Sequence, residues 1–373
     1  MIIERLAIIG ASYLQLPLVI KAKEMGIETH CFAWEEGAVC KDICDFFYPV
    51  SVLDKNEILK ICKEVKITGI TTIATDIAIP TISFVAHYLN LVSNSIPVSL
   101  KTTNKGEMRN QFKIDNISSP RYSVMNTYSV DLLKEMSFPL IVKPTDRSGS
   151  RGINKVYNQV ELEKGIYEAL NESISKTVIV EEFIEGKEVS VESISWNGKH
   201  YILAITDKLT TGEPHFVELA HHQPSHFVHD DLNKIKKLTL KALNCLGIVN
   251  GASHTELKID NDGNAFVIEV GARMGGDFIG SHLVELSTGY DFLKSVILVA
   301  LNKFIPPKIS NRHFAGVYFL CKETKHLLPY FYKNNEFDVE KEIKTPELKF
   351  ISSSNDRSGF LIYKSNAKVE LLN

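Results

Sequence analysis

Two glutamates lie on the two predicted strands of one hairpin. Glu256 belongs to the strand His254–Ile259 and Glu269 to the strand Ala265–Val270, on either side of a turn at Asn261–Asn264. Carboxylates that face each other across antiparallel strands repel unless a cation lies between them. Both glutamates stand in apolar runs, where an unpaired charge is costly. Mg²⁺ prefers one or two carboxylates together with phosphate oxygens and water, so the pair predicts a magnesium site.

Basic residues that suit phosphate chemistry occur beside this hairpin and earlier in the chain. Arg273 follows the second glutamate and can neutralise charge on a transferring phosphoryl group. Lys143 ends the predicted strand Phe138–Pro144, which runs into the polar loop Thr145–Gly152. Backbone N–H groups and hydroxyls of such a loop can bind anionic oxygens, and the lysine adds a point charge. The loop is not a Walker A motif, and taken alone it is equally typical of a surface turn.

A strand ending in Phe183 and Ile184 provides backbone groups and apolar side chains that suit the edge and face of an adenine. Glu188, four residues beyond Ile184, can accept hydrogen bonds from ribose hydroxyls. The alternative is that this stretch is an acidic part of the surface.

The elements that position these residues follow from hydrophobic periodicity. In the first hundred residues, short apolar strands alternate with helices, which predicts a parallel sheet. Gly10-Ala-Ser12 lacks the second and third glycines of a dinucleotide-binding loop, so we expect a Rossmann-like domain without a nucleotide. Further on, Asn197-Gly198 predicts a hairpin turn, and Leu232–Leu246 predicts a helix that ends at Gly247. After Pro306 we expect a short, separate β-rich module.

Composition excludes several classes of protein. The 373 residues carry a formal net charge of −3, which argues against a protein that binds nucleic acid by neutralising phosphates. No apolar run approaches the ~18 residues that span a bilayer, so no membrane partner is expected. The six cysteines show neither a CxxC pair nor zinc-ligand spacing and indicate reduced thiols in a cytoplasmic protein.

Together these motifs resemble the ATP-grasp superfamily of carboxylate–amine ligases over nearly the whole chain. The resemblance includes FPLIVKP with its loop, VEEFIEGKEVSVE, the pair TELK and IEVGARMGG, and the tail motif Ser353–Phe360. The details are most similar to the branch that contains biotin carboxylase, carbamoyl phosphate synthase and the L-amino acid ligases. The implied fold class is α/β and α+β, with a Rossmann-like N-terminal domain, central ATP-grasp domains and a small β-rich C-terminal module. The expected boundaries are 1–104, 105–305 (with a small lid subdomain at about 118–183 and a larger one at about 184–305) and 306–373.

The resemblance implies ATP and Mg²⁺ as cofactors, with Mn²⁺ as an alternative ion. It assigns Lys105 and Lys143 to the ATP phosphates and gives Lys143 and Arg273 catalytic roles. The phosphates are expected to be covered by Ser148, Gly149, Ser150 and Gly152. Adenine is expected to be held by Glu181, Glu182, Phe183 and Ile184, and the ribose by Glu188. The expected metal ligands are Glu256 and Glu269.

Substrate residues are expected beside Arg273 and the phosphates. The candidates are Lys208, Glu218, His221, His222, His254, Arg273, Gly275, Gly276, Asp277, Ser281 and His282. Glu218 is expected to bind a substrate ammonium group, and His221 or His222 to contact the carboxylate or act on the amine. A pair of histidines after a strand is more often part of a surface turn.

The implied activity joins a carboxylate, activated as an acyl phosphate, to an amine, and Phe216-Val-Glu218 with the following histidines resembles the amino-acid ligases. The partners are then small-molecule carboxylates and amines, with a homodimer as the expected assembly. One departure is Gly271, where many relatives have a metal-binding asparagine. Two alternatives stay open: a bicarbonate-using carboxylase-type enzyme, and a non-catalytic ATP-binding regulatory module, which only Gly271 favours.

Overall fold

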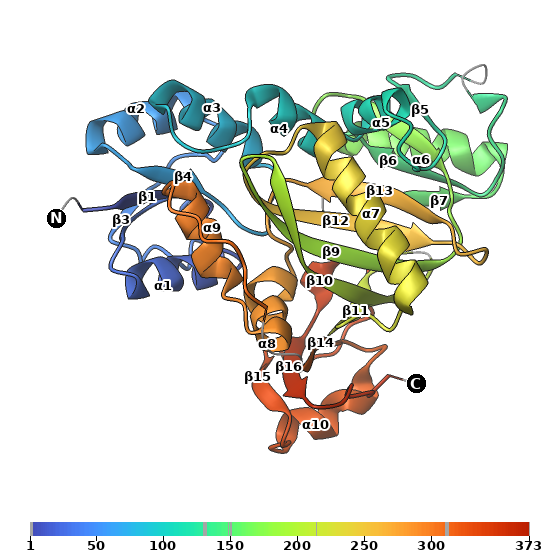
Figure 1. Cartoon of the computed structure of the whole chain (residues 1–373). Coiled ribbons are helices and arrows are strands. Elements are labelled where there is room, and N and C mark those ends of the chain that lie inside the picture. Colours follow the sequence, from blue (N-terminus) through green and yellow to red (C-terminus); the bar gives the residue numbers. More distant parts are fainter. Residues whose placement is uncertain are drawn as a thin grey trace.

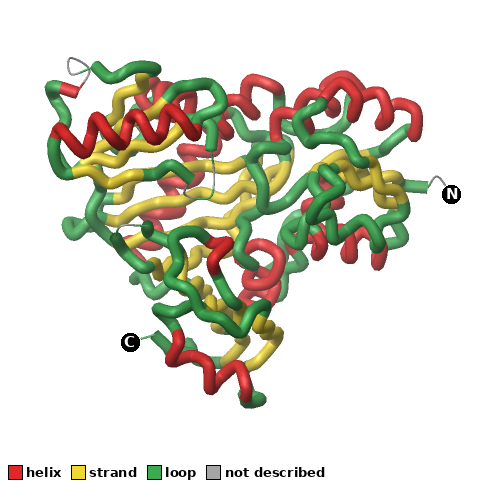
Figure 2. Tube along the Cα trace, turned by 180° about the vertical axis from the view of Figure 1, so that it is seen from behind, coloured by secondary structure: helices red, strands yellow, loops and turns green. Residues whose placement is uncertain are grey.

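A computed structural model describes residues 3–129, 133–147, 149, 151–213, 215–309 and 313–372 of the chain. Figure 1 shows its main parts in chain order: an N-terminal unit in blue, a lid in teal and green, a large central sheet, and C-terminal strands in red. Seen from behind in Figure 2, the lid and the N-terminal sheet lie on opposite sides of the molecule.

The N-terminal unit contains a parallel sheet in the order β3-β2-β1-β4, as the alternation of strands and helices predicts. Asp54 caps the helix α2 by accepting a hydrogen bond from the backbone of Glu57, and Lys66 ends it in the left-handed conformation. The elements are β1 (Arg5–Ile9), α1 (Leu16–Glu24), β2 (Glu28–Phe32), β3 (Phe46–Tyr48), α2 (Lys55–Val65), β4 (Gly69–Thr71), α3 (Ile79–Leu89) and α4 (Ile96–Thr103). Strand β3 is not predicted from the sequence, because three residues show no readable period.

The helix α5 (Lys105–Ile114) leads from this unit to the lid, an antiparallel sheet in the order β5-β8-β6-β7. Apolar residues of the lid strands, including Val142 and Val180, pack against the side of the helix α6 that carries Ile166. The lid elements are β5 (Tyr122–Met125), β6 (Leu140–Pro144), β7 (Asn154–Val156), α6 (Gln159–Glu172) and β8 (Val178–Glu182).

The large sheet has eight strands in the order β13-β12-β9-β10-β11-β14-β16-β15. The predicted turn between β9 and β10 is confirmed, with Asn197 and Gly198 both at positive φ (49° and 78°), as a two-residue hairpin turn requires. The helix α7 ends, as predicted, before a left-handed Gly247. The strands of the large sheet and the helices beside them, from residue 187 to residue 300, are β9 (Lys187–Trp196), β10 (Lys199–Thr210), β11 (Glu218–Gln223), α7 (His229–Leu246), β12 (Gly251–Ile259), β13 (Ala265–Gly271), the π-helical segment η2 (Ile279–Leu283), α8 (Val284–Thr288) and α9 (Phe292–Ala300).

The expected β-rich C-terminal module is present, and its strands continue this sheet instead of forming one of their own. Strand β14 pairs antiparallel with β11 on one side and with β16 on the other. Without β14, β11 would present an unpaired edge, and pairing satisfies its backbone groups. The elements are β14 (Phe314–Leu320), η3 (Lys325–Leu327), α10 (Leu328–Tyr332), β15 (Asp338–Ile343), η4 (Ser354–Asp356) and β16 (Gly359–Ser365).

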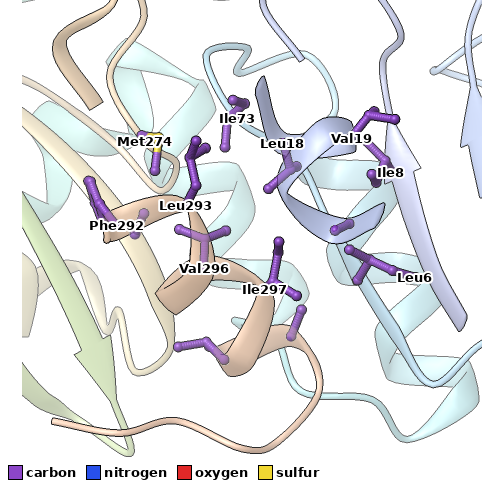
Figure 3. Close-up of a cluster of buried hydrophobic side chains, with 14 of the residues drawn as sticks. Leu6, Ile8, Leu18, Val19, Ile73, Met274, Phe292, Leu293, Val296 and Ile297 are labelled. Atoms are coloured by element: carbon purple, nitrogen blue, oxygen red, sulfur yellow. The ribbon is translucent and has the colours of Figure 1, made fainter. Parts of the chain in front are cut away.

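One apolar cluster joins the first and the later parts of the chain. Leu18 and Val19 of α1 pack in the same cluster as Phe292, Val296 and Ile297 of α9, as Figure 3 shows. The N-terminal unit is therefore held against the large sheet by a shared core, and the loops at the ends of β4 and β13 meet there. In the described part of the chain, no helix is long and apolar enough to cross a membrane.

Candidate active site

A cleft of about 480 Å³ lies where the N-terminal unit, the lid and the large sheet meet. Most of the residues that the sequence analysis predicts to bind nucleotide, metal or substrate line this cleft. The predicted residues that line it are Lys105, Lys143, Gly149, Glu181, Glu182, Phe183, Ile184, Glu188, Lys208, Glu218, His221, His254, Glu256, Glu269, Arg273, Gly276 and Asp277.

The two glutamates predicted as metal ligands are direct cross-strand partners on β12 and β13. Glu269 accepts a hydrogen bond from Lys105 Nζ at 2.9 Å, and Glu256 accepts one from Lys208 Nζ at 2.7 Å. The register shifts immediately after this pair, so Ile268 is an extra residue on β13. Its carbonyl accepts a hydrogen bond from Arg109 Nη2 at 2.7 Å instead of one from the neighbouring strand.

Lys208 is buried among three carboxylates. Its Nζ lies 2.5 Å from Glu188, 2.7 Å from Glu256 and 3.6 Å from Glu218. Burial lowers the pKa of this lysine, but the three glutamates outweigh burial and hold its pKa well above the ordinary value. Lys208 is therefore a permanent cation at the centre of the cleft.

A second buried ion-pair group joins the lid strands β6 and β8 to the helix α5. Glu181 contacts Arg109 Nε at 2.7 Å and Lys143 Nζ at 2.6 Å, and all three side chains are buried. Burial raises the pKa of the Glu181 carboxyl, yet Arg109 and Lys143 together bring it below its usual value. Its carboxylate is thus the counter-ion of two cations, a role that its position in the sequence does not indicate.

The arginine predicted to stabilise phosphoryl transfer is held by the N-terminal unit. Asp76, which follows β4, accepts two hydrogen bonds from Arg273, at 2.9 Å from Nε and 2.8 Å from Nη2. Such a bidentate pair fixes the plane of the guanidinium group. Burial lowers the pKa of Arg273, but Asp76 and other carboxylates raise it above its ordinary value, so the charge is permanent.

Beneath the glycines at 275 and 276 lies a buried charged pair. Glu192 is fully buried, contacts His254 Nδ1, and accepts a hydrogen bond from the backbone of Gly275 at 2.9 Å. Burial lowers the pKa of His254, but Glu192 and Glu256 raise it to about 9. The other ring nitrogen, His254 Nε2, lies 3.4 Å from Glu256. Because Glu192 contacts both His254 and the backbone of Gly275, it orients the imidazole and the loop together.

On the other side of Lys208, Arg357 joins two carboxylates. It donates to Asp277 Oδ2 at 2.8 Å and to Glu218 Oε2 at 3.1 Å, and its guanidinium group lies 3.7 Å from the centre of the Phe319 ring. His221 Nε2 is 3.7 Å from Asp277 Oδ2. Burial raises the pKa of Asp277, but Arg357 and His221 bring it well below its usual range.

At the end of the cleft formed by β8, Phe183 has two lysines over its ring. Lys155 Nζ lies 3.7 Å and Lys258 Nζ 4.3 Å from the ring centre, and Lys258 donates to the carbonyl of Ile184 at 3.1 Å. Burial lowers the pKa of Lys258. An aromatic ring, backbone carbonyls and cations here suit the predicted adenine end of a nucleotide.

Some predicted residues lie elsewhere. Ser148 and Ser150 fall outside the described residues, and Gly152 lies against Pro144 and Glu172. Gly275 and Ser281 line a smaller cavity next to the cleft.

The interpretation of the two adjacent histidines as a surface turn is wrong, because both are buried on β11. Successive residues of a strand point to opposite faces, so only His221 lines the cleft. His222 Nδ1 lies 2.8 Å from the hydroxyl of Tyr363 on the other side, and burial lowers its pKa to about 3. The candidate role of His222 at the substrate is therefore excluded.

Several charged residues of the site were not predicted, among them Asp76, Arg109, Glu192, Lys258 and Arg357. Arg109 and Glu192 carried a weak signal, since each is a charge at a position where the helix or strand pattern expects an apolar residue. Asp76 and Arg357 lie in loops, where no period marks a buried charge.

The carboxylates in the cleft fit a magnesium ion whose remaining ligands are phosphate oxygens. Glu256 and Glu269 offer hard oxygen ligands on facing positions, whereas the described residues include no group of three or more His, Cys, Asp or Glu side chains placed to hold a metal. A site with two carboxylates and phosphate oxygens is typical of Mg²⁺.

The sequence and the fold are similar to those of known proteins. Residues 136–281 match the family described as the ATP-grasp domain. An alanine–anticapsin ligase of Bacillus subtilis is 27% identical over 274 residues, which cover 63% of this chain and 57% of that protein. A D-alanine–D-alanine ligase of Marinomonas sp. is 30% identical over 197 residues, or 50% of this chain and 60% of that protein.

The chain thus spans little more than half the length of these curated relatives. Among solved structures, an L-amino acid ligase from Bacillus licheniformis superposes with a TM-score of 0.82 over 98% of this chain and 94% of that one, at 23% identity. This likeness establishes the fold, including the N-terminal unit and the C-terminal strands.

Proposed function

We propose, from the ATP-grasp domain that this chain carries in residues 136–281, that the protein is an ATP-dependent ligase joining a carboxylate to an amine, and that its substrates are amino acids. The observation that carries the proposal is that Lys105, Lys143, Lys208 and Arg273, drawn from three parts of the fold, line a single cleft together with the facing pair Glu256 and Glu269. The relatives named as alanine–anticapsin and D-alanine–D-alanine ligases support the substrate class.

The proposed reaction has two steps. A carboxylate oxygen of the first substrate attacks the γ-phosphorus of ATP, and the bond to ADP breaks. The amine of the second substrate then attacks the carbonyl carbon of the acyl phosphate, inorganic phosphate leaves, and the nitrogen loses a proton. The enzyme contributes positioning, charge neutralisation and exclusion of water.

Residue roles follow from the contacts. Lys105 and Lys143, at the lid side, are proposed to bind the phosphates, and Arg273, which Asp76 orients, to stabilise charge on the transferring phosphoryl group. Phe183 and Ile184 are proposed to hold adenine, and Glu188 the ribose. Glu256 and Glu269 would hold Mg²⁺, which when bound neutralises and orients the phosphates.

The ion pairs of the cleft explain how it accepts a highly charged nucleotide. Lys105 and Lys208 have glutamates as partners, so these cations are balanced inside the protein. We propose that a phosphate of ATP replaces Glu269 as the partner of Lys105. In this proposal, Lys105 breaks its ion pair with Glu269 only when a phosphate oxygen binds in place of the carboxylate. Such an exchange leaves no buried charge unpaired at either stage.

The test is ADP and phosphate release by the purified protein with ATP, Mg²⁺ and pairs of amino acids. The proposal expects turnover that requires a carboxylate and an amine. Turnover with bicarbonate but with no amino acid would instead support a carboxylase-type enzyme. Nucleotide binding without turnover under any of these conditions would support a regulatory module. The expected homodimer and cytoplasmic location remain predictions, and sedimentation of the purified protein tests the first.

A further inference from the structure

A second cavity of about 180 Å³ opens from the cleft on the side away from the lid. Tyr13, Ala74, Gly276 and Asp277 line both, so the two spaces are adjacent. This volume is far above the ~10–15 Å³ that a single water needs. We call this second cavity the side pocket.

Apolar residues from both ends of the chain form about half of the walls of the side pocket. Six of them are Leu14, Pro17 and Ile73 from the N-terminal unit and Phe278, Phe319 and Phe360 from the later part of the chain. Phe278 packs against Phe360 with ring centres 4.4 Å apart and lies 6.4 Å from Phe319. Lysine, serine and asparagine residues (Lys344, Ser354 and Asn355) also line the pocket. The walls are suited to an apolar group that enters from the cleft.

The backbone at the boundary between cleft and pocket has an unusual conformation. Asp277 and Phe278 are consecutive and both left-handed, with φ of 50° and 65°, although neither is glycine. This conformation is uncommon for a bulky residue and clusters at functional sites. It lets Asp277 reach Arg357 while the neighbouring Phe278 packs against Phe360, so adjacent residues serve the charged and the apolar part of one binding site.

The charged part holds two carboxylates beside one arginine. Arg357 pairs with Glu218 and Asp277. Glu218 also lies 3.6 Å from Lys208 Nζ, and Asp277 lies 3.7 Å from His221 Nε2, so a ligand ammonium group would share these carboxylates with the cations already present. The side chain of Arg357 is 8% exposed, and its Nε has no hydrogen-bond partner among the described residues. Because this nitrogen is buried, it does not itself face the pocket, but the Arg357 side chain lines the pocket and supplies the cation that a ligand carboxylate needs.

We propose that the side pocket binds the side chain of the amino-acid substrate and selects a large apolar or aromatic one, while Asp277, Glu218 and Arg357 bind the ammonium and carboxylate groups. This inference rests on the proposed function and names the substrate class for it. Leucine, methionine and phenylalanine are then preferred over glycine, alanine and aspartate.

The first measurement compares kcat/KM for these six amino acids by ADP release from the full-length protein with saturating ATP, Mg²⁺ and a common amine partner. Each methylene that a fitted pocket buries changes the rate constant by about tenfold or more, so the large apolar group should exceed alanine by at least about tenfold. Equal values for alanine and phenylalanine would overturn the side-pocket assignment and leave the ligase proposal standing. Absence of ADP release with every amino acid would overturn both.

The second measurement fills the pocket. Ser281 on η2 lines the side pocket but not the cleft, so Ser281→Leu reduces the pocket volume without touching the nucleotide site. The preference for phenylalanine over alanine should fall by about tenfold or more, with the KM for ATP unchanged within twofold. Ser281→Ala, which removes the same hydroxyl without adding volume, should keep the preference. Ser137→Leu, at an exposed lid position outside both cavities, should behave as the wild type. An unchanged preference in a folded Ser281→Leu protein would overturn the assignment.

Discussion

Gly271 leaves the space that the carboxylate of Asp76 occupies. A Cβ atom on residue 271 would lie 2.7 Å from Asp76 Oδ1 and 3.3 Å from the guanidinium carbon of Arg273. A Cβ atom at the first of these distances would force the Asp76 carboxylate to shift, so a side chain at 271 competes with Asp76 for the space in which it pairs with Arg273. The departure from the asparagine expected at this position is therefore coupled to the way this chain orients its arginine.

The first prediction tests this coupling. Gly271→Ala should lower kcat by about tenfold or more, because Arg273 loses its bidentate partner, and should change the KM for ATP much less. Asp76→Ala should have a similar effect. In the double variant the added Cβ meets no carboxylate, so the two losses should not add. Additive effects in steady-state ADP release would show that the two positions act independently.

The second prediction concerns the facing glutamates. Glu269→Gln removes one charge from the proposed Mg²⁺–phosphate cluster without changing volume, and should abolish ATP turnover while the fold remains intact. Glu163→Gln, on an exposed face of α6, is the matched control and should be fully active. Circular dichroism and ADP release at several Mg²⁺ concentrations are the measurements. Full activity of Glu269→Gln at ordinary Mg²⁺ would remove Glu269 from the metal site.

The third prediction concerns the stability of the buried group around Glu181. Glu181→Gln leaves Arg109 and Lys143 without their carboxylate, and loss of one partner of a buried ion pair costs about 3–5 kcal/mol. The free energy of unfolding in urea should fall by an amount of that order. Glu107→Gln, exposed on α5, should change it by less than about 0.5 kcal/mol.

The same carboxyl predicts a pH dependence. The pKa of Glu181 is lower in the folded protein than in the unfolded chain, so its contribution is present above the unfolded value near 4.3 and is lost as pH falls through the folded pKa. Wild type should therefore lose more stability than Glu181→Gln as pH falls below that unfolded value. Parallel losses in both proteins would mean that other carboxyls dominate.

The fifth prediction separates substrate from nucleotide. Glu218→Ala leaves Arg357 with one carboxylate and removes the proposed ammonium partner, so the KM for the amino acid should rise much more than the KM for ATP. Arg273→Lys should act mainly on kcat, since lysine cannot form the bidentate pair with Asp76. If Glu218→Ala changes only the ATP parameters, Glu218 belongs to the nucleotide site.

Local sequence determined much of the framework. Periodicity and turn residues identify α2, the hairpin at Asn197-Gly198, the end of α7 at Gly247 and the hairpin that carries Glu256 and Glu269. Each depends on contacts within a few residues, such as a cap, a left-handed turn or a two-residue alternation, and these are legible in a single chain. The motifs that resemble the ATP-grasp superfamily then identify most of the residues that line the cleft.

Tertiary structure alone decided which charges are partners. Asp76 and Arg273 are 197 residues apart, and Arg109, Lys143 and Glu181 come from α5, β6 and β8. It also decided that β14 joins the large sheet and that of two adjacent histidines only His221 faces the cleft. Local preferences do not encode these outcomes, because they depend on which surfaces the packed core of α1 and α9 brings together, and the cost of a buried unpaired charge then selects the partner.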